Sequence, residues 1–548
     1  MKTWWSASGT SGKAMDPVAN PRSEESVKLD SRLLKITVLY MLAPTMAALD
    51  TTIVYVAQRT FVDEFSSTQA IVAWTMTAYT LSLAAVIPLT GWAANRFGTK
   101  RLILGSVLLF SLGSLLCATA SNVTLLVTFR ALQGLGGGIL LPLTFTILTR
   151  EAGPGRLARA LAIGGVPGFI APICGPILGG WLIGSFGWQW IFLVNVPIGL
   201  FTLVLAGFVL PKDEPASAES LDVVGMLLLS PGLVMLLYGA SLIPGRGTVS
   251  NPRVYVPVAV GFTLIVVFVF HALYRASNPL IDLGLLRNRM VASANATRFL
   301  YAVGFFGTCL LLPGYFQQVL GKTPLQSGLL LLPQTLTGAA VAPLVGHLTE
   351  KRGPRDVVLA GMTLIVAGMG VFIYGISQHR VHIPVLLAGL AVFGIGTGCS
   401  MMPVAWTAVH TLETREIAHG STLFNVNHNA AAAIGAALMS VLLTSILNRS
   451  ADIVAARRAD SILQDAARRG VAPDLSKLPH QVFAPDFMEH VTKDLSRAYA
   501  MVFAAAAILV ATTFIPVWFL PKKPTGNPPA LAPAGCAHPR TEAPRCDR

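Results

Sequence analysis

Fourteen long apolar runs constrain this chain more than any other feature of its sequence. A helix needs roughly 20 apolar residues to cross a bilayer core about 30 Å thick. Because backbone groups in a bilayer must bond within their own segment, such runs predict spanning helices and not open sheets. The predicted spans are 33–57, 70–94, 102–121, 124–147, 159–183, 189–210, 223–243, 254–275, 290–316, 328–348, 357–378, 382–408, 419–446 and 498–520.

The composition agrees with an all-α polytopic membrane protein. Only 12% of the 548 residues are charged, against about 25% in soluble domains. The net charge of +14 comes largely from Lys and Arg in short loops between apolar runs, so we expect no nucleic-acid partner. The six cysteines match no common zinc spacing, and the sequence predicts neither a metal nor a cofactor.

The basic residues also predict the orientation in the membrane. One set of loops, together with the N-terminal arm, carries eighteen Lys and Arg residues, and the opposite short loops carry five. Cytoplasmic loops hold the excess of positive charge. We therefore expect a multi-pass protein of the cell (inner) membrane with both termini in the cytoplasm.

Three polar segments flank or interrupt the apolar runs. Residues 1–32 lack the apolar stretch of a signal peptide and predict a flexible cytoplasmic arm. Residues 521–548 are proline-rich and predict a disordered cytoplasmic tail. Residues 447–497 predict a long external loop, in which "ADIVAARRADSILQDAARR" has the pattern of an amphipathic surface helix.

An internal echo divides the chain into two halves. "GWAANRFGTKR" begins at Gly91, and "GHLTEKRGPRD" begins at Gly346. Both stretches have Gly at their first and eighth positions, and each follows the second span of its half. The echo predicts two six-helix bundles, 33–210 and 290–520, with two extra helices in 211–289. Repeated bundles around a shared path are typical of alternating-access transporters.

Arg130 and Asp50 are the charges that most need explanation. An arginine at the bilayer centre costs about 2.5–3.5 kcal/mol on insertion scales. At 1.5 Å per residue, Arg130 lies about 9 Å and Asp50 about 10 Å from the outer ends of their spans. Asp50 is the only acid well inside any predicted span. The pair predicts a proton site; snorkelling of Arg130 and a permanently ionised structural pair are the alternatives.

Small residues and prolines mark the fourth and fifth spans. Gly134 and Gly138 have the GxxxG spacing that allows close helix approach. The stretch "GVPGFIAPICGPILGG" combines prolines, which bend helices, with glycines that permit tight contact. Its candidate functional residues are Gly175, Pro176, Gly179 and Gly180.

Other polar residues within the spans are candidates for lining a substrate cavity. Interhelical hydrogen bonds, worth about 0.6 kcal/mol on average, are the alternative role. Arg298 has no carboxylate partner visible in the sequence and suits an anionic substrate group or a lipid headgroup. The candidates are Gln133, Asn195, Arg298, Gln334, Asn425 and His428.

Several motifs together resemble a known family. "LDTTIVYVA", "GWAANRFGTKR", "RALQGLGGG" and "GPILGG" are similar to signature segments of the major facilitator superfamily, in its fourteen-helix drug:proton antiporter branch (EmrB/QacA-like). The resemblance extends over about 33–520. It implies the major facilitator fold with 14 transmembrane helices.

The resemblance also implies residue roles. Asp50 and Arg130 would form the proton-coupling pair, and the Gly-Pro run of the fifth span would limit leakage between the bundles. The conformational latch would comprise Gly91, Asn95, Arg96, Gly98, Lys100 and Arg101. Asn95 replaces the family's aspartate at this position, so the latch loses a charge.

These observations predict proton-coupled efflux of amphiphilic small molecules by alternating access. The alternative is an exporter or flippase of lipids or lipid-like metabolites, and a membrane sensor is a more distant one. The sequence has no HExxH or GxSxG motif in or beside the spans, which argues against an enzyme. The expected partners are the cargo, protons and membrane lipids, and we expect a monomer.

Overall fold

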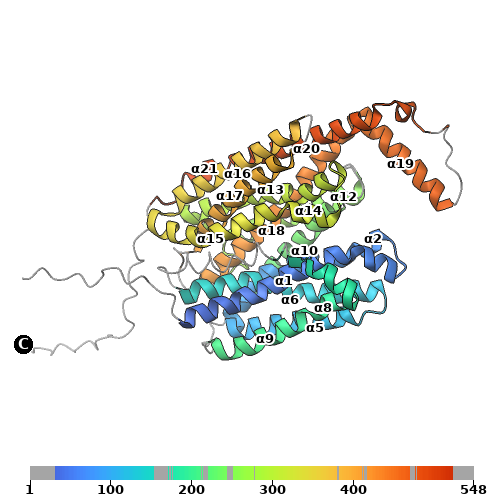
Figure 1. Ribbon diagram of the computed structural model, residues 1–548. Coiled ribbons are helices and arrows are strands. Elements are labelled where there is room, and N and C mark those ends of the chain that lie inside the picture. The colour runs from blue at the N-terminus through green and yellow to red at the C-terminus, as the bar shows by residue number, and fades with distance from the viewer. Residues whose placement is uncertain are drawn as a thin grey trace, which may run out of the picture.

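The computed structural model describes residues 31–152, 171, 174–175, 177–210, 213, 220–242, 251–276, 278–378, 382–409, 412, 416–469, 476 and 478–522. Every regular element in these ranges is a helix. The helices form two bundles that lie side by side along most of their length (Figure 1). Pro176, the arm up to residue 30 and the tail from residue 523 lie outside the described residues.

The first bundle contains the N-terminal helices. Helix α6 is central, because α1, α3 and α5 all pack against it. Helix α9 closes the bundle against α1 and α5. Its elements are α1 (Ser31–Glu64), α2 (Gln69–Val72), α3 (Trp74–Val86), η1 (Ile87–Leu89), α4 (Thr90–Phe97), α5 (Thr99–Ala118), α6 (Val123–Ala152), a helix over Ile177–Phe186, α8 (Trp190–Leu193) and α9 (Asn195–Val209).

The second bundle repeats this plan. Helix α17 packs against α15 and α16, while α13 packs against α18 and α20. Its elements are η2 (Leu283–Arg287), α13 (Arg289–Gln318), α14 (Pro324–Leu330), α15 (Leu332–Arg352), α16 (Pro354–Ser377), α17 (Ile383–Val409), α18 (Ile417–Leu447), α19 (Ala451–Arg469), η4 (His480–Phe483), α20 (Phe487–Ala511) and α21 (Phe514–Val517).

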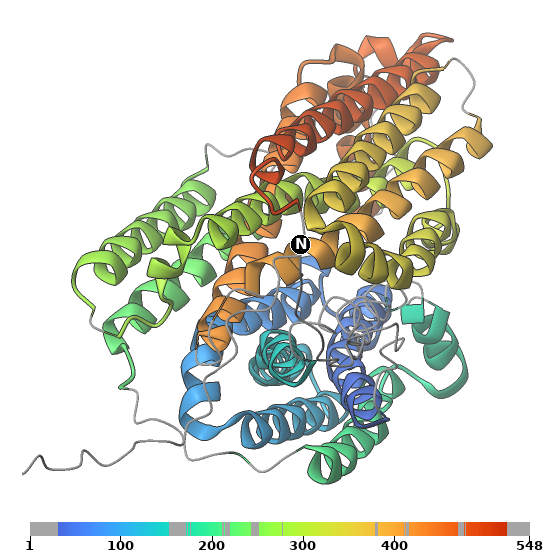
Figure 2. The same ribbon diagram turned by 90° about the vertical axis from the view of Figure 1, so that its left-hand side faces the viewer.

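Two further helices, α10 (Val223–Ser241) and α12 (Pro252–Tyr274), form a hairpin beside the junction of the bundles (Figure 2). Helix α10 contacts both α3 and α18. Asp222 caps α10 by accepting a hydrogen bond from Gly225 N (2.8 Å), and it also accepts one from Leu280 N (3.2 Å) and pairs with His271 Nε2 of α12 (2.9 Å). Burial raises the pKa of Asp222, but these hydrogen bonds outweigh burial and hold it below its ordinary value.

The two halves share an uncommon joint. Gly98 separates α4 from α5 with φ 85° and ψ 155°, and Gly353 separates α15 from α16 with φ 86° and ψ 160°. A side chain is strained at such a positive φ, so glycine is needed at both places. The glycines are the eighth residues of the two echoed stretches, which therefore form the same joint.

Eleven described helices are long and apolar enough to cross a membrane. Helices α1 and α15 cover the runs predicted at 33–57 and 328–348 but are not among the eleven, and the predicted fifth span is described only in part. The structure is therefore compatible with fourteen spans, and that number stays a prediction.

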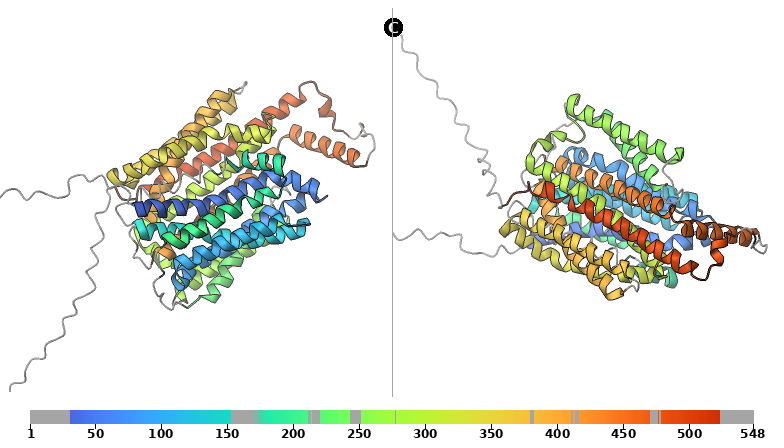
Figure 3. Two further views of the ribbon diagram at one scale, coloured as in Figure 1. Left: turned by 60° about the horizontal axis from the view of Figure 1, so that its bottom comes forward. Right: turned by 90° about the horizontal axis from the view of Figure 1, so that it is seen from above.

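The region predicted as a loop over 447–497 is largely helical. Helix α19 matches the predicted amphipathic helix and projects from the bundle (Figures 1 and 3). The helix that contains the start of the predicted span 498–520 is longer than that span, because α20 begins at Phe487. Val491 and Leu495 pack against the core, and Asp494 accepts a hydrogen bond from Ser450 Oγ (2.6 Å). These contacts hold the first turns of α20, which precede residue 498.

Candidate functional site

A buried ion pair joins α1 to α6 inside the first bundle. Arg130 Nη1 of α6 donates to Asp50 Oδ2 of α1, and both side chains are 0% exposed. Arg130 Nε donates to the carbonyl of Thr75 (3.2 Å). The similar depths estimated from the sequence thus correspond to direct contact, and Arg130 does not snorkel to the surface.

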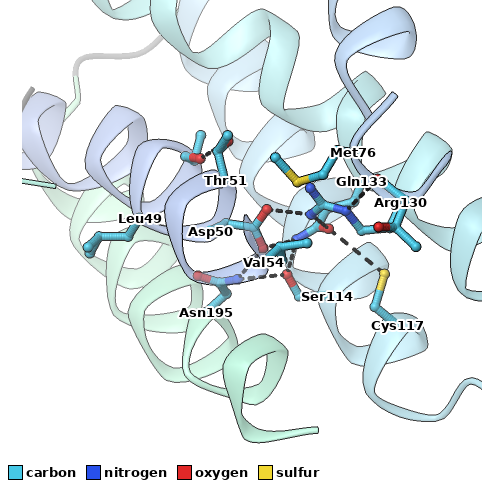
Figure 4. A network of polar contacts seen from close by, with 12 residues as sticks. Leu49, Asp50, Thr51, Val54, Met76, Ser114, Cys117, Arg130, Gln133 and Asn195 are labelled. Atoms are coloured by element: carbon cyan, nitrogen blue, oxygen red, sulfur yellow. Dashed lines mark hydrogen bonds and ion pairs between the residues drawn. The ribbon is translucent and has the colours of Figure 1, made fainter. Parts of the chain in front are cut away.

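Polar side chains from two more helices complete this site (Figure 4). Asp50 Oδ1 accepts hydrogen bonds from Gln133 Nε2 (2.9 Å) and Asn195 Nδ2 (2.9 Å). Gln133 Nε2 also donates to Ser114 Oγ (2.6 Å). The carboxylate therefore joins α1 to α6 and α9, and Ser114 adds α5 through Gln133 and Asn195. We call Asp50, Ser114, Arg130, Gln133 and Asn195 the Asp50 cluster.

An aromatic side chain lies against the arginine. The guanidinium carbon of Arg130 lies 4.1 Å from the centroid of the Tyr79 ring in α3. Arg130 Nη2 and Asn195 Oδ1 are buried without a hydrogen-bond partner within the described residues. Buried polar atoms normally have partners. These unpaired atoms of the cluster are therefore available to bind a water molecule or to form new hydrogen bonds when a proton is bound or released.

The glycines of α6 bring its neighbours close to this cluster. A Cβ at Gly134 would lie 2.5 Å from the carbonyl oxygen of Tyr79, and a Cβ at Gly138 would lie 2.6 Å from that of Leu83. Both contacts are backbone of α3, so neither position accepts a larger residue without a shift. The close approach predicted from the GxxxG spacing is present.

The fifth span contacts α1 next to Asp50. A Cβ at Gly175 would lie 1.9 Å from Thr52 Oγ1, and one at Gly179 would lie 3.2 Å from Ile53 Cγ2. Gly180 faces open space. Two of the four predicted residues of this helix therefore pack beside the Asp50 cluster.

The predicted latch is not an extended loop, since Gly98 alone separates α4 from α5. Asp213 accepts hydrogen bonds from the backbone of Lys100 (2.8 Å) and Arg101 (3.0 Å), and Lys100 Nζ donates to the carbonyls of Gly207 and Leu210 at the end of α9 (2.8 Å each). These basic residues thus stabilise the first bundle itself.

Two other latch residues reach the second bundle. Asn95 Nδ2 lies 3.3 Å from His419 Nε2 of α18. A Cβ at Gly91 would lie 2.8 Å from Thr422 Oγ1, also in α18. Arg96 lies in the last turn of α4. The motif therefore combines contacts within one bundle and contacts between the two.

Further contacts between the bundles lie next to these. Ser421 Oγ of α18 donates to the carbonyl of Pro142 in α6 (2.7 Å). The rings of Phe145 in α6 and Phe424 in α18 stack with centroids 5.7 Å apart. These residues lie in the half of α6 and α18 nearest Gly98, so the described contacts close the junction at that end.

The candidates in the second bundle do not form one network. Arg298 of α13 is 7% exposed, lies 5.0 Å from the centroid of Phe424, and has no partner for its Nε within the described ranges. His428 lies close to Arg298 and packs against Phe306. Asn425 donates to the carbonyl of Ser421 in its own helix (2.9 Å).

Gln334 of α15 makes a different contact, with its Nε2 3.8 Å from Cys309 Sγ of α13. Gln133 and Asn195 were predicted to line a cavity, and in the structure both bind Asp50. The sequence did not single out Ser114 and Tyr79, whose residue types are common in membrane helices, or His419, which stands at the first position of the predicted span 419–446. No group of potential metal ligands occurs in the part of the chain that the structure describes.

Comparisons with known proteins agree with this architecture. Residues 40–436 match the model of the Major Facilitator Superfamily. A multidrug resistance protein B homolog of Mycobacterium tuberculosis is 50% identical over 520 residues, covering 94% of this chain and 96% of the relative. The multidrug export protein EmrB of Escherichia coli is 29% identical, with 76% of this chain and 81% of EmrB covered.

Solved structures share the fold at low sequence identity. The human organic anion transporter MFSD10 superposes with a TM-score of 0.56 at 14% identity, covering 87% of this chain and 99% of MFSD10. The proton:xylose symporter XylE superposes with a TM-score of 0.52, also at 14% identity, covering 88% and 96%. The chain belongs to the Major Facilitator Superfamily and is an EmrB-like multi-pass transporter, not an enzyme.

Proposed function

We propose that this chain exports amphiphilic small molecules in exchange for protons. The names of the relatives from Mycobacterium tuberculosis and Escherichia coli support multidrug efflux. None of the relatives named above is described as a lipid transporter, and no contact in the structure requires a lipid cargo. We therefore keep the small-molecule proposal over the lipid alternative.

The observation that carries the proposal is the Asp50 cluster. Asp50 is an acid that can bind a proton, and it connects three helices, α1, α6 and α9, through Arg130, Gln133 and Asn195. A protonated carboxyl group no longer offers Arg130 a counter-charge. Proton binding at Asp50 would therefore weaken the links between α1, α6 and α9 together.

Such a change suits a switch between two arrangements of the bundles. Moving one charge through 100 mV is worth about 2.3 kcal/mol. Breaking a buried ion pair costs about 3–5 kcal/mol when one charge is left uncompensated. The two quantities are of similar size, so a proton gradient can drive rearrangement of this cluster.

The contacts near Gly98 support a state that is closed at that end of the junction. With the positive-inside bias of the loops, we propose that this end is cytoplasmic, that both termini lie there, and that the structure is outward-facing. Asn95 with His419 and Gly91 with Thr422 would then separate when the transporter opens to the cytoplasm.

Cargo contact is proposed for the aromatic and polar side chains around Arg298. Phe424, His428 and Tyr301 surround it, and Tyr301 Oη and His428 Nδ1 are also buried without a partner among the described residues. An arginine stays protonated in proteins. This region therefore suits the acidic group of an amphiphile whose apolar body contacts the rings.

Reconstitution of the purified full chain tests the proposal. Liposomes loaded with an amphiphilic dye are given an inward or an outward pH gradient. We expect dye to accumulate against its own gradient only when protons flow the opposite way. Movement that is equal with and without the pH gradient would contradict proton coupling.

A further inference from the structure

A groove on the outer face of the second bundle is not explained by cargo transport or proton coupling. It has a volume of about 670 Å³ and lies between α13 and the α20–α21 segment. Nearly all of its wall is apolar. Its lining residues are Arg289, Ala292, Ser293, Ala296, Leu300, Leu509, Thr512, Ile515, Pro516 and Phe519.

The groove has a charged end and an apolar end. Arg289 is the first residue of α13 and is exposed. Its guanidinium carbon lies 4.8 Å from the centroid of the Phe519 ring. Leu300 and Leu509 mark the other end. None of the ten lining residues is acidic, so the charge within the groove is positive.

The length of the groove matches one leaflet of a membrane. Arg289 and Leu300 are eleven residues apart in α13, which corresponds to about 16 Å at 1.5 Å per residue. Half of a bilayer core about 30 Å thick is about 15 Å. An acyl chain that follows the groove would thus end near the bilayer midplane.

The charged end lies at the level where lipid headgroups are found. Arg355 N, two residues after Gly353, donates to the carbonyl of Pro521 (3.4 Å), so the chain just after α21 lies beside that joint. Trp518 is 62% and Phe519 47% exposed, and aromatic residues are enriched at the membrane interface. The arginine is therefore placed to meet a phosphate group, and the rings to meet the glycerol region.

We infer that this groove binds an anionic phospholipid of the leaflet beside the Gly353 joint, with its phosphate on Arg289 and one acyl chain between α13 and α20–α21. Charge selects the anionic lipid over a zwitterionic one, since Arg289 has no acid beside it in the groove. Arg298 lies nine residues further along α13, on the opposite face of the helix. The lipid site is therefore distinct from the region proposed for cargo.

Lipid retention measured by native mass spectrometry tests this inference. The full chain is purified from nanodiscs of phosphatidylcholine mixed with phosphatidylglycerol. We expect the wild-type chain to retain phosphatidylglycerol in preference. Arg289→Ala should lower that preference about fivefold, because one basic residue contributes about that much to anionic-lipid binding.

Three further variants distinguish the effect of the charge from the effect of the groove. Arg287→Ala is the matched control, because Arg287 is exposed two residues away but does not line the groove. It should retain lipid as the wild type does. Ala296→Phe fills the middle of the groove and should reduce retention of both lipids, and Arg289→Lys should keep part of the preference.

Three results would overturn the inference. One is equal retention of both lipids by the wild-type chain. Another is the same loss with Arg287→Ala as with Arg289→Ala, which would indicate general surface charge. The third is dimer cross-linking of Ala296→Cys in nanodiscs, which would assign the groove to a second copy. If Ala296→Phe fails to fold, the comparison of Arg289→Ala with Arg287→Ala still decides the matter.

Discussion

Each bundle buries an arginine in a helix of its interior, and the two arginines have different surroundings. Arg130 is 0% exposed and bound to Asp50, with Gln133 completing the contact. Arg298 is 7% exposed, lies against Phe424, and has no described partner for its Nε. A buried charge with its own counter-charge holds helices together. A buried charge without one is able to bind a charge that arrives from outside.

The largest effect is expected when each arginine is removed in turn, which tests whether the two arginines contribute differently to stability. Arg130→Ala leaves Asp50 buried without a counter-charge, and we expect a loss of about 3–5 kcal/mol in the free energy of unfolding. Arg298→Ala leaves no acidic group without its counter-charge, so the free energy of unfolding should fall by about 1 kcal/mol or less. Denaturation of the purified variants in one detergent measures both. Equal losses would contradict the distinction.

The next largest effect concerns cargo charge. A hydrogen bond to a charged group contributes about 1.5–3 kcal/mol, so Arg298→Gln should slow export of an amphiphilic carboxylate at least tenfold. Arg298→Lys should retain part of the rate, because it keeps the charge but not the planar fork. The control is the neutral amide of the same amphiphile. An equal loss of export rate for the amide would show that Arg298 does not recognise the charge of the cargo.

A third prediction concerns the packing around the paired arginine. Gly134→Ala places a Cβ 2.5 Å from the carbonyl oxygen of Tyr79, and overpacking of this kind costs about 1–3 kcal/mol. Gly180→Ala is the matched control, since its Cβ meets no atom within 4 Å. Thermal unfolding should separate the two variants. Similar midpoints would mean that α3 and α6 can move apart without cost.

The smallest expected effect is at the contact between the bundles. Asn95→Asp adds a charge opposite His419, and charge-assisted hydrogen bonds are roughly twice as strong as neutral ones. We expect the closed state near Gly98 to gain severalfold in population, measured by labelling single cysteines on the two faces. Asn122→Asp adds the same charge away from the junction, where Asn122 caps α6. Unchanged labelling in Asn95→Asp would show that Asn95 has no role in the latch.

Much of the fold followed from the sequence, because apolar runs and charged loops are local signals. The echoed stretches predicted the repeated plan, and the matching angles at Gly98 and Gly353 give its physical basis. The start of α20 could not be predicted in this way. Phe487 to Arg497 are polar enough to leave the membrane, and they stay helical because of contacts with the core and with Ser450.

The site was predictable in part. Asp50 and Arg130 stood out because charges are rare in membrane spans. The contact of Gln133 and Asn195 with Asp50 depends on how each helix is rotated, which a polar residue in an apolar run does not reveal. Asn95 and His419 are 324 residues apart in the chain, so only the folded arrangement brings them together.

Proton binding at Asp50 is proposed to drive export, and the Asp50→Asn variant tests this proposal. Asparagine keeps the size and much of the hydrogen bonding of the side chain but cannot release a proton. Wild type and variant are reconstituted in parallel liposomes with one imposed pH gradient, and substrate accumulation is followed with the associated proton flux. We predict that Asp50→Asn still binds substrate but neither accumulates it uphill nor moves protons with it. Uphill export by Asp50→Asn at the wild-type rate would contradict the account.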